Sequence, residues 1–83
     1  MNKILIDARE MEHPVPLERG IAAISTLGKD DYIYMLNRKN PIPLIKLAKE
    51  RGLNTLSYED DQNTWHILIS IQDENRLKEL LDV

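Results

Sequence analysis

The same short motif, Pro-x-Pro-Leu, occurs twice in this chain, at residues 14–17 and again at residues 41–44. Each copy follows an apolar, strand-like segment and precedes residues with helical spacing. Proline fits the first turn of a helix, where its missing N–H would have no partner, and it favours extended geometry in the residue before it. The chain therefore contains two strand–turn–helix units, and each Pro-x-Pro marks the start of a helix.

The spacing of apolar residues predicts four strands and two main helices. The strands are expected at residues 3–7, 31–37, 54–60 and 64–71, and the helices at residues 14–27 and 41–51. The side chains expected in the core are Leu17, Ile21, Ile24, Ile45, Ala48 and Ile67. A further short helix is expected at about residues 73–82, with Asp73 as its N-cap.

The order of these elements is β-α-β-α-β-β, followed by the additional C-terminal helix. Strand–helix–strand crossovers are right-handed, which places both main helices on one face of the sheet, and the last two strands form an antiparallel hairpin. We therefore expect an α/β (α+β) fold, a two-layer sandwich with a four-stranded mixed sheet. At 83 residues the chain forms a single domain, 1–83, with its core in residues 3–71.

The face of the sheet opposite the main helices is open to two interpretations. If Trp65 and Ile67 point toward the helices, then His66 and Leu68 point away from them. That face is either an exposed apolar patch of the kind that marks an interaction surface, or it is covered by the C-terminal helix. The sequence alone leaves both alternatives open.

Composition excludes several classes of function. The eleven Lys and Arg residues are scattered among fourteen Asp and Glu residues, so no basic stripe is available for nucleic acid. No apolar segment is long enough to span a membrane, and the first strand is too short for a signal-peptide core, so we expect a cytoplasmic protein. The absence of cysteine excludes disulfides, thiol catalysis and thiolate metal sites.

The run from Leu5 to Pro16, Leu-Ile-Asp-Ala-Arg-Glu-Met-Glu-His-Pro-Val-Pro, resembles the L-D-x-R-G-x-x-C-P-x-P pattern of the TusA/SirA-like sulfur-relay proteins. Chain length and element order resemble that family over residues 3 to about 71. The His-Pro-x-Pro-Leu-Glu start, the Asn-Pro-x-Pro-Leu second turn and the Trp-x-Ile-x-Ile last strand are similar to an uncharacterised family of TusA-like domains of unknown function. The resemblance implies the TusA/SirA-like fold.

The resemblance also identifies a chemical difference. TusA-like sulfur carriers hold a persulfide on the cysteine of Cys-Pro-x-Pro, and His13 stands at the matching position of this chain. An imidazole cannot carry a sulfane sulfur, so sulfur relay by that mechanism is excluded. Glu10 also replaces the glycine of the family pattern.

His13 is the main candidate functional side chain, because it lies beside a helix N-terminus, where unpaired N–H groups favour an anion. It can act as a base or ligand, or it can only cap and pack against the turn. Arg9 is expected to pair with Asp7 or Glu12, and Arg38 with Lys39 forms a cationic turn at the second helix. The candidate binding residues are Arg9, Glu12, His13, Pro14, Pro16, Arg19, Arg38 and Lys39, and no residue is assigned as catalytic.

A metal site and a cofactor are not expected. His13 and His66 are the only histidines, they are far apart in sequence, and neither belongs to a local metal-binding motif, so with Glu12 they are weak candidate ligands.

Two functional hypotheses remain. The first is a non-enzymatic binding or accessory module that recognises a protein partner, or a second copy of itself in a homodimer, through the His13 turn or the open sheet face. The second is a redox or sulfur-metabolism accessory enzyme that uses His13 as an acid/base or a metal ligand, and not as a persulfide carrier.

Overall fold

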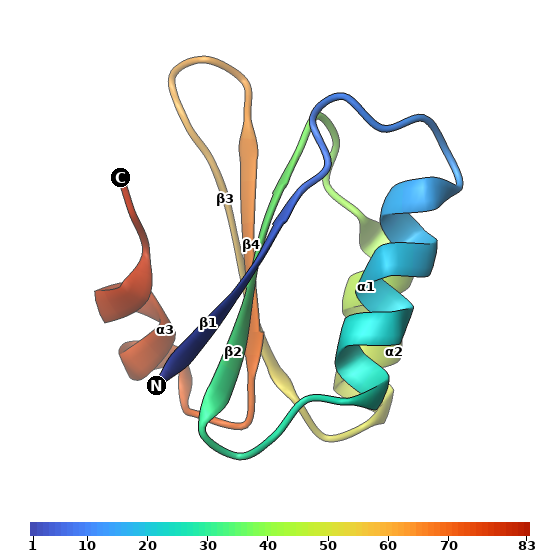
Figure 1. The fold of residues 1–83 in the computed structure, drawn as a ribbon. Helices are drawn as coiled ribbons and strands as arrows, with labels where there is room; N and C mark the ends of the chain where they lie inside the picture. The colour runs from blue at the N-terminus through green and yellow to red at the C-terminus, as the bar shows by residue number, and fades with distance from the viewer.

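Four strands form one mixed sheet in the computed structural model, which describes residues 1–83 (Figure 1). The strands are β1 (Asn2–Asp7), β2 (Asp31–Asn37), β3 (Asn54–Glu59) and β4 (Trp65–Ser70). Their spatial order is β1-β2-β4-β3; β1 and β2 are parallel, and β4 is antiparallel to both β2 and β3. The predicted mixed sheet is thereby confirmed.

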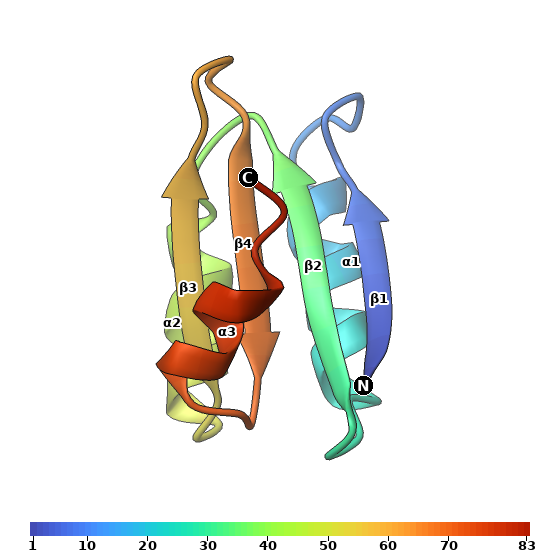
Figure 2. The same cartoon turned by 90° about the vertical axis from the view of Figure 1, so that its left-hand side faces the viewer.

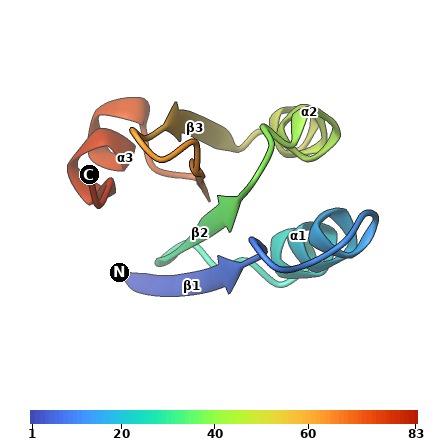
Figure 3. The same ribbon diagram turned by 90° about the horizontal axis from the view of Figure 1, so that it is seen from above.

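Both main helices lie on the same face of this sheet, as predicted (Figures 1 and 3). They are α1 (Val15–Ser25) and α2 (Ile42–Glu50), and each has a proline of its Pro-x-Pro motif in the first turn. Both begin one residue later than expected. Pro16 and Pro43 fit these positions because the first N–H groups of a helix have no acceptor within the helix. A residue without an N–H therefore loses no hydrogen bond there.

The main core lies between the sheet and these two helices. Ile67 and Ile69 of β4 point into it and are fully buried, together with Ile33 and Met35 of β2. Alternate residues of a strand point to opposite faces, which is why His66 and Leu68 lie on the other side. Of the remaining expected core residues, the structure buries Ile24 and Ala48 and packs Leu17 and Ile45 partly buried against the same cluster.

The prediction that Ile21 belongs to the core is wrong, because this side chain is 38% exposed. The buried residue beside it is Gly20, and a Cβ added to Gly20 would lie only 2.7 Å from Leu44 Cδ1. The two helices α1 and α2 therefore approach each other closely at Gly20, because this residue has no side chain to keep Leu44 away. Consecutive helical residues point about 100° apart, so this contact turns Ile21 toward the rim.

The other face of the sheet is partly covered by a third helix, α3 (Glu74–Leu80), as Figure 2 shows. Asp73 caps it as predicted, since its Oδ1 accepts a hydrogen bond from the Arg76 N–H at 2.9 Å. Leu77 of α3 is fully buried against Tyr34 and Leu68. Of the two alternatives for this face, the structure shows coverage by the C-terminal helix over β3 and β4.

The edge strand β1 stays outside the cover of α3 (Figure 2), and its Leu5 is 58% exposed. Strand β4 ends at Ser70, one residue earlier than expected, and Ile71 beyond it is 49% exposed. No helix has the length and apolar character that crossing a membrane requires.

Candidate functional site

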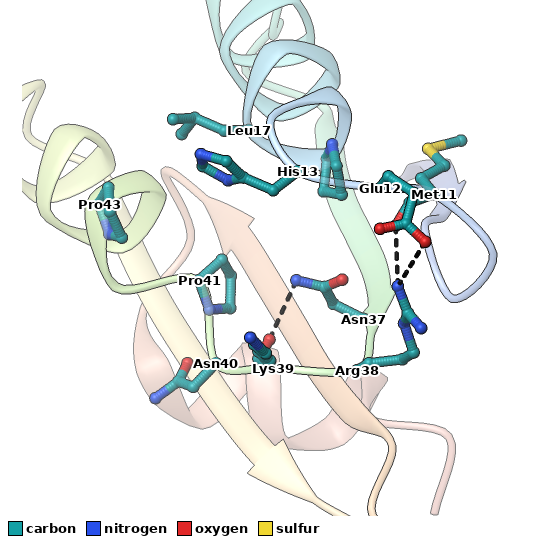
Figure 4. A pocket seen from close by; sticks show the side chains of 11 residues that line it. Met11, Glu12, His13, Leu17, Asn37, Arg38, Lys39, Asn40, Pro41 and Pro43 are labelled. Atoms are coloured by element: carbon teal, nitrogen blue, oxygen red, sulfur yellow. Dashed lines mark hydrogen bonds and ion pairs between the residues drawn. The ribbon is translucent and has the colours of Figure 1, made fainter.

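The candidate site is a pocket of about 300 Å³ between the two Pro-x-Pro turns (Figure 4). It forms there because β1 and β2 are parallel neighbours, so the turns that follow them lie at the same end of the sheet. In open α/β sheets, this carboxyl end is where ligands commonly bind. The pocket is lined by Met11, Glu12, His13, Pro16, Leu17, Asn37, Arg38, Lys39, Asn40, Pro41 and Pro43.

His13 lies at the side of the pocket that α1 forms. Its imidazole extends beside Leu17 toward the beginning of α2, where Pro41 and Pro43 form the opposite wall (Figure 4). Its side chain is exposed and forms no hydrogen bond or ion pair within the chain. A catalytic imidazole is normally oriented by a third group, and the chain supplies no such group to His13.

Arg38 connects the two turns. Its Nη2 donates a hydrogen bond to the Met11 carbonyl at 3.2 Å and lies 3.9 Å from Glu12 Oε1. These contacts tie the turn after β2 to the turn after β1 and direct the guanidinium away from His13 (Figure 4). The side chain of Arg38 remains 60% exposed. Arg38 therefore both shapes the pocket and places a positive charge at its edge.

Arg9 forms the first of the two pairings expected for it. Its guanidinium donates two hydrogen bonds to the Asp7 carboxylate, at 2.7 and 2.8 Å, and these bonds lower the pKa of Asp7 to about 2. Glu12, the other partner expected for Arg9, pairs with Arg38 instead. The Arg9–Asp7 pair lies outside the pocket, so it orders the start of the turn and does not contribute to the pocket wall.

The pocket offers unused hydrogen-bonding groups. No side chain caps α1, and the N–H of Leu17 in its first turn, which lines the pocket, has no backbone acceptor. Such N–H groups, with the positive end of the helix dipole, attract negative charge. Asn40, which lines the pocket, also carries the one buried side-chain oxygen or nitrogen of the chain that has no partner, Oδ1.

The structure brings five of the eight predicted binding residues together and leaves three outside. The residues that line the pocket are Glu12, His13, Pro16, Arg38 and Lys39, and those that do not are Arg9, Pro14 and Arg19. Sequence reasoning missed the apolar and amide lining, notably Leu17, Asn40 and Pro43. The repeated Pro-x-Pro-Leu motif is the signal that could have found them, because it predicts two equivalent turns at one end of a pair of parallel strands.

His66, the second weak metal candidate, lies on the opposite face of the sheet from His13. Its two ring nitrogens are already bonded, to the Tyr34 hydroxyl at 2.7 Å and to Asp60 Oδ2 at 2.8 Å. The side chains of the chain include no group of three or more His, Cys, Asp or Glu that could hold a metal ion. The two histidines therefore do not form one site.

Comparison with known proteins places this fold. The sequence profile of the family described as "Uncharacterized conserved protein (DUF2249)" matches residues 5–71, which contain all of the pocket residues. The chain belongs to the DUF2249 family. This DUF2249 protein is similar to the crystal structure of a SirA-like protein from Desulfitobacterium hafniense, with 27% sequence identity and a TM-score of 0.70.

That similarity covers 84% of the DUF2249 chain and 99% of the SirA-like chain. The predicted TusA/SirA-like fold is thus confirmed, and the protein is a small member of a family whose function is uncharacterised. No curated protein matches the chain.

Proposed function

We propose that this DUF2249 protein is a small, non-enzymatic binding module of the cytoplasm, and that it takes an acidic segment of a partner protein into the pocket between its two Pro-x-Pro turns. The observation that supports this most strongly is the pocket itself, which both turns form together at the ends of β1 and β2.

The walls of the pocket match the chemistry of such a ligand. Arg38 and Lys39 supply positive charge, and the free Leu17 N–H at the start of α1 supplies a donor for a carboxylate. Met11 and Leu17 supply apolar surface, which a peptide side chain beside the acidic residue would cover. A rigid turn with two prolines loses little conformational entropy when it binds.

The geometry supports recognition over catalysis. General acid–base chemistry needs a titratable group held by a partner that sets its orientation, and His13 has none within the chain. The absence of cysteine removes the persulfide chemistry of the Cys-Pro-x-Pro proteins.

An NMR titration of the ¹⁵N-labelled chain tests the proposal. The probe is a short peptide of alternating Glu and Leu, compared with the same peptide carrying Gln in place of Glu. The Glu peptide is expected to shift the signals of His13, Lys39 and the Leu17 amide, whereas the Gln peptide is not. Equal shifts from both peptides, or shifts confined to the α3 face, would contradict the proposal.

Matched variants sharpen the test. Lys39→Ala is expected to weaken binding of the Glu peptide, whereas Lys29→Ala, which removes an exposed lysine outside the pocket, is expected to leave it unchanged. His13→Ala is expected to weaken binding while changing the free energy of unfolding by less than about 1 kcal/mol, as exposed substitutions usually do. Binding of a divalent metal that depends on His13, or turnover that depends on His13, would instead favour an accessory enzyme.

The sheet face is a poorer candidate for this role. Tyr34 and Leu68 lie buried beneath α3, so charged substitutions there would disrupt the fold and would not probe an open surface.

A further inference from the structure

A chain of hydrogen bonds crosses the α3 side of the sheet, the face opposite the two main helices. Asp60 Oδ2 lies 2.8 Å from His66 Nε2, and His66 Nδ1 lies 2.7 Å from the Tyr34 hydroxyl oxygen. That oxygen also accepts a hydrogen bond from the Asp82 backbone N–H at 2.9 Å. The chain thus connects the β3–β4 turn, β4 and β2 to the segment that follows α3.

The central members of this chain are shielded from water. Tyr34 is 1% exposed and His66 is 7% exposed, so their polar groups depend on each other for hydrogen bonds. Burial also raises the pKa of Tyr34, whose hydroxyl therefore stays protonated.

The positions of the protons follow from the donors at the two ends. The Asp60 carboxylate accepts hydrogen bonds, including that of His66, which together lower its pKa, so His66 Nε2 carries a proton. At the other end, the Asp82 N–H can only donate to the Tyr34 oxygen. In a neutral imidazole, Nδ1 is then an acceptor, and Tyr34 donates its hydroxyl proton to it. Every group in the chain is satisfied by this one arrangement.

A second proton on His66 reverses part of this arrangement. The Nδ1–H of the imidazolium becomes a donor to Tyr34, and the Tyr34 hydroxyl proton must turn away from it. A hydroxyl proton that turns to the side of the Asp82 N–H, whose nitrogen lies 2.9 Å from the Tyr34 oxygen, displaces that hydrogen bond. The bond between His66 and Asp60 persists as an ion pair.

We propose that His66, Tyr34 and Asp82 form a pH-sensitive latch, in which protonation of His66 releases the segment after α3 from the sheet. Release removes one attachment of the cover over the apolar cluster of Tyr32, Leu68 and Leu77.

The other groups around the chain do not substitute for the latch. On β3, the Tyr58 ring centroid lies 6.3 Å from that of His66. On β1, Lys3 Nζ lies 4.5 Å from the centre of the Tyr34 ring and 2.7 Å from Asp82 Oδ2. Because this Lys3–Asp82 pair is exposed, it contributes little to holding the segment.

The charges of the remaining elements point elsewhere. On α3, Arg76 pairs with Glu79 on the exposed side, and the contacts with the apolar cluster come from Leu77 and Leu80. Arg9 is the charged side chain close enough to Asp60 to interact with it electrostatically, and its guanidinium is hydrogen-bonded to Asp7.

NMR of the full chain between pH 8 and pH 5 tests the latch. The ring signals of His66 and the backbone amide of Asp82 are expected to titrate with one midpoint. Below it, the Asp82 amide should lose protection from hydrogen exchange on the order of tenfold after correction for intrinsic rates, the size expected for one hydrogen bond. An Asp82 amide that is unaffected while the His66 ring gains its proton would overturn the proposal.

Variants separate the latch from its neighbours. Tyr34→Phe removes the hydroxyl and should leave the Asp82 amide unprotected at every pH while His66 still titrates. His66→Gln should abolish the acid response of Asp82. If His66→Gln fails to fold, Asp60→Asn provides the second test, because loss of the carboxylate that favours the imidazolium should move the release to lower pH.

Lys3→Gln is the matched control. It removes the ion pair to Asp82 and keeps the hydroxyl and the imidazole, so the acid response should persist with the same midpoint. If Lys3→Gln abolishes the response, or if Asp60→Asn leaves its midpoint unchanged in a folded protein, the latch assignment is wrong.

Discussion

Gly20 of α1 lies against Leu44 of α2 so closely that a Cβ on Gly20 would be 2.7 Å from Leu44 Cδ1. Leu44 is fully buried, so its side chain must shift within the core to admit a Cβ at Gly20. Glycine usually weakens a helix relative to alanine, by roughly 0.5–1 kcal/mol. Its presence inside α1 is explained by this helix–helix contact.

Gly20→Ala is therefore expected to destabilise the protein by about 1–3 kcal/mol, the usual cost of overpacking, despite the better helix propensity of alanine. Urea denaturation measures this change. In a Leu44→Ala background the added methyl group has room, so the same substitution should be neutral or stabilising. An equal effect of Gly20→Ala in both backgrounds would show that the contact does not limit packing.

Ile24 and Ile21 form a natural pair for testing the orientation of α1. Ile24 is 6% exposed and Ile21 is 38% exposed, although both follow the same apolar spacing. Ile24→Ala should cost about 2–5 kcal/mol through the cavity it leaves, whereas Ile21→Ala should cost about 1 kcal/mol. Thermal or urea unfolding of the two variants decides this, and equal losses would mean that α1 is rotated from the orientation described.

The Asp7–Arg9 pair predicts an effect of acid. Because the folded state lowers the pKa of Asp7 to about 2, the ionised carboxylate favours the folded state above about pH 4. That contribution is lost as the pH falls from about 4 toward 2. An NMR titration of the Asp7 carboxyl carbon should show a midpoint near pH 2, and Arg9→Gln should return it to the ordinary range. A normal midpoint in the unaltered protein would contradict the pairing.

The chain is expected to acquire no covalent sulfur from a persulfide donor, because it contains no cysteine. Mass spectrometry after incubation with such a donor provides the measurement. His13→Cys, which restores the Cys-Pro-x-Pro pattern, is the positive control, and it is expected to gain a sulfur atom. A sulfur adduct on the unaltered chain would refute this prediction.

Sequence alone determined the features that depend on neighbouring residues. The two Pro-x-Pro motifs predicted the start of both helices to within one residue, since the missing N–H of proline is a local property. Alternation along Ile67 and Leu68 predicted which residues of β4 face the helices, because successive side chains of a strand point to opposite faces. The turn around His13 was found by the same kind of local reasoning.

Only the tertiary structure decided the features that depend on residues far apart in the chain. The burial of Gly20 in place of Ile21 results from the position of Leu44 on another helix, and helical spacing cannot reveal it. The pocket exists because the parallel pairing of β1 and β2 brings two turns to one end of the sheet. His66 was only a weak candidate ligand in the sequence, and the structure shows that Tyr34 engages it across the sheet, because strand register places together groups whose contact no local pattern encodes.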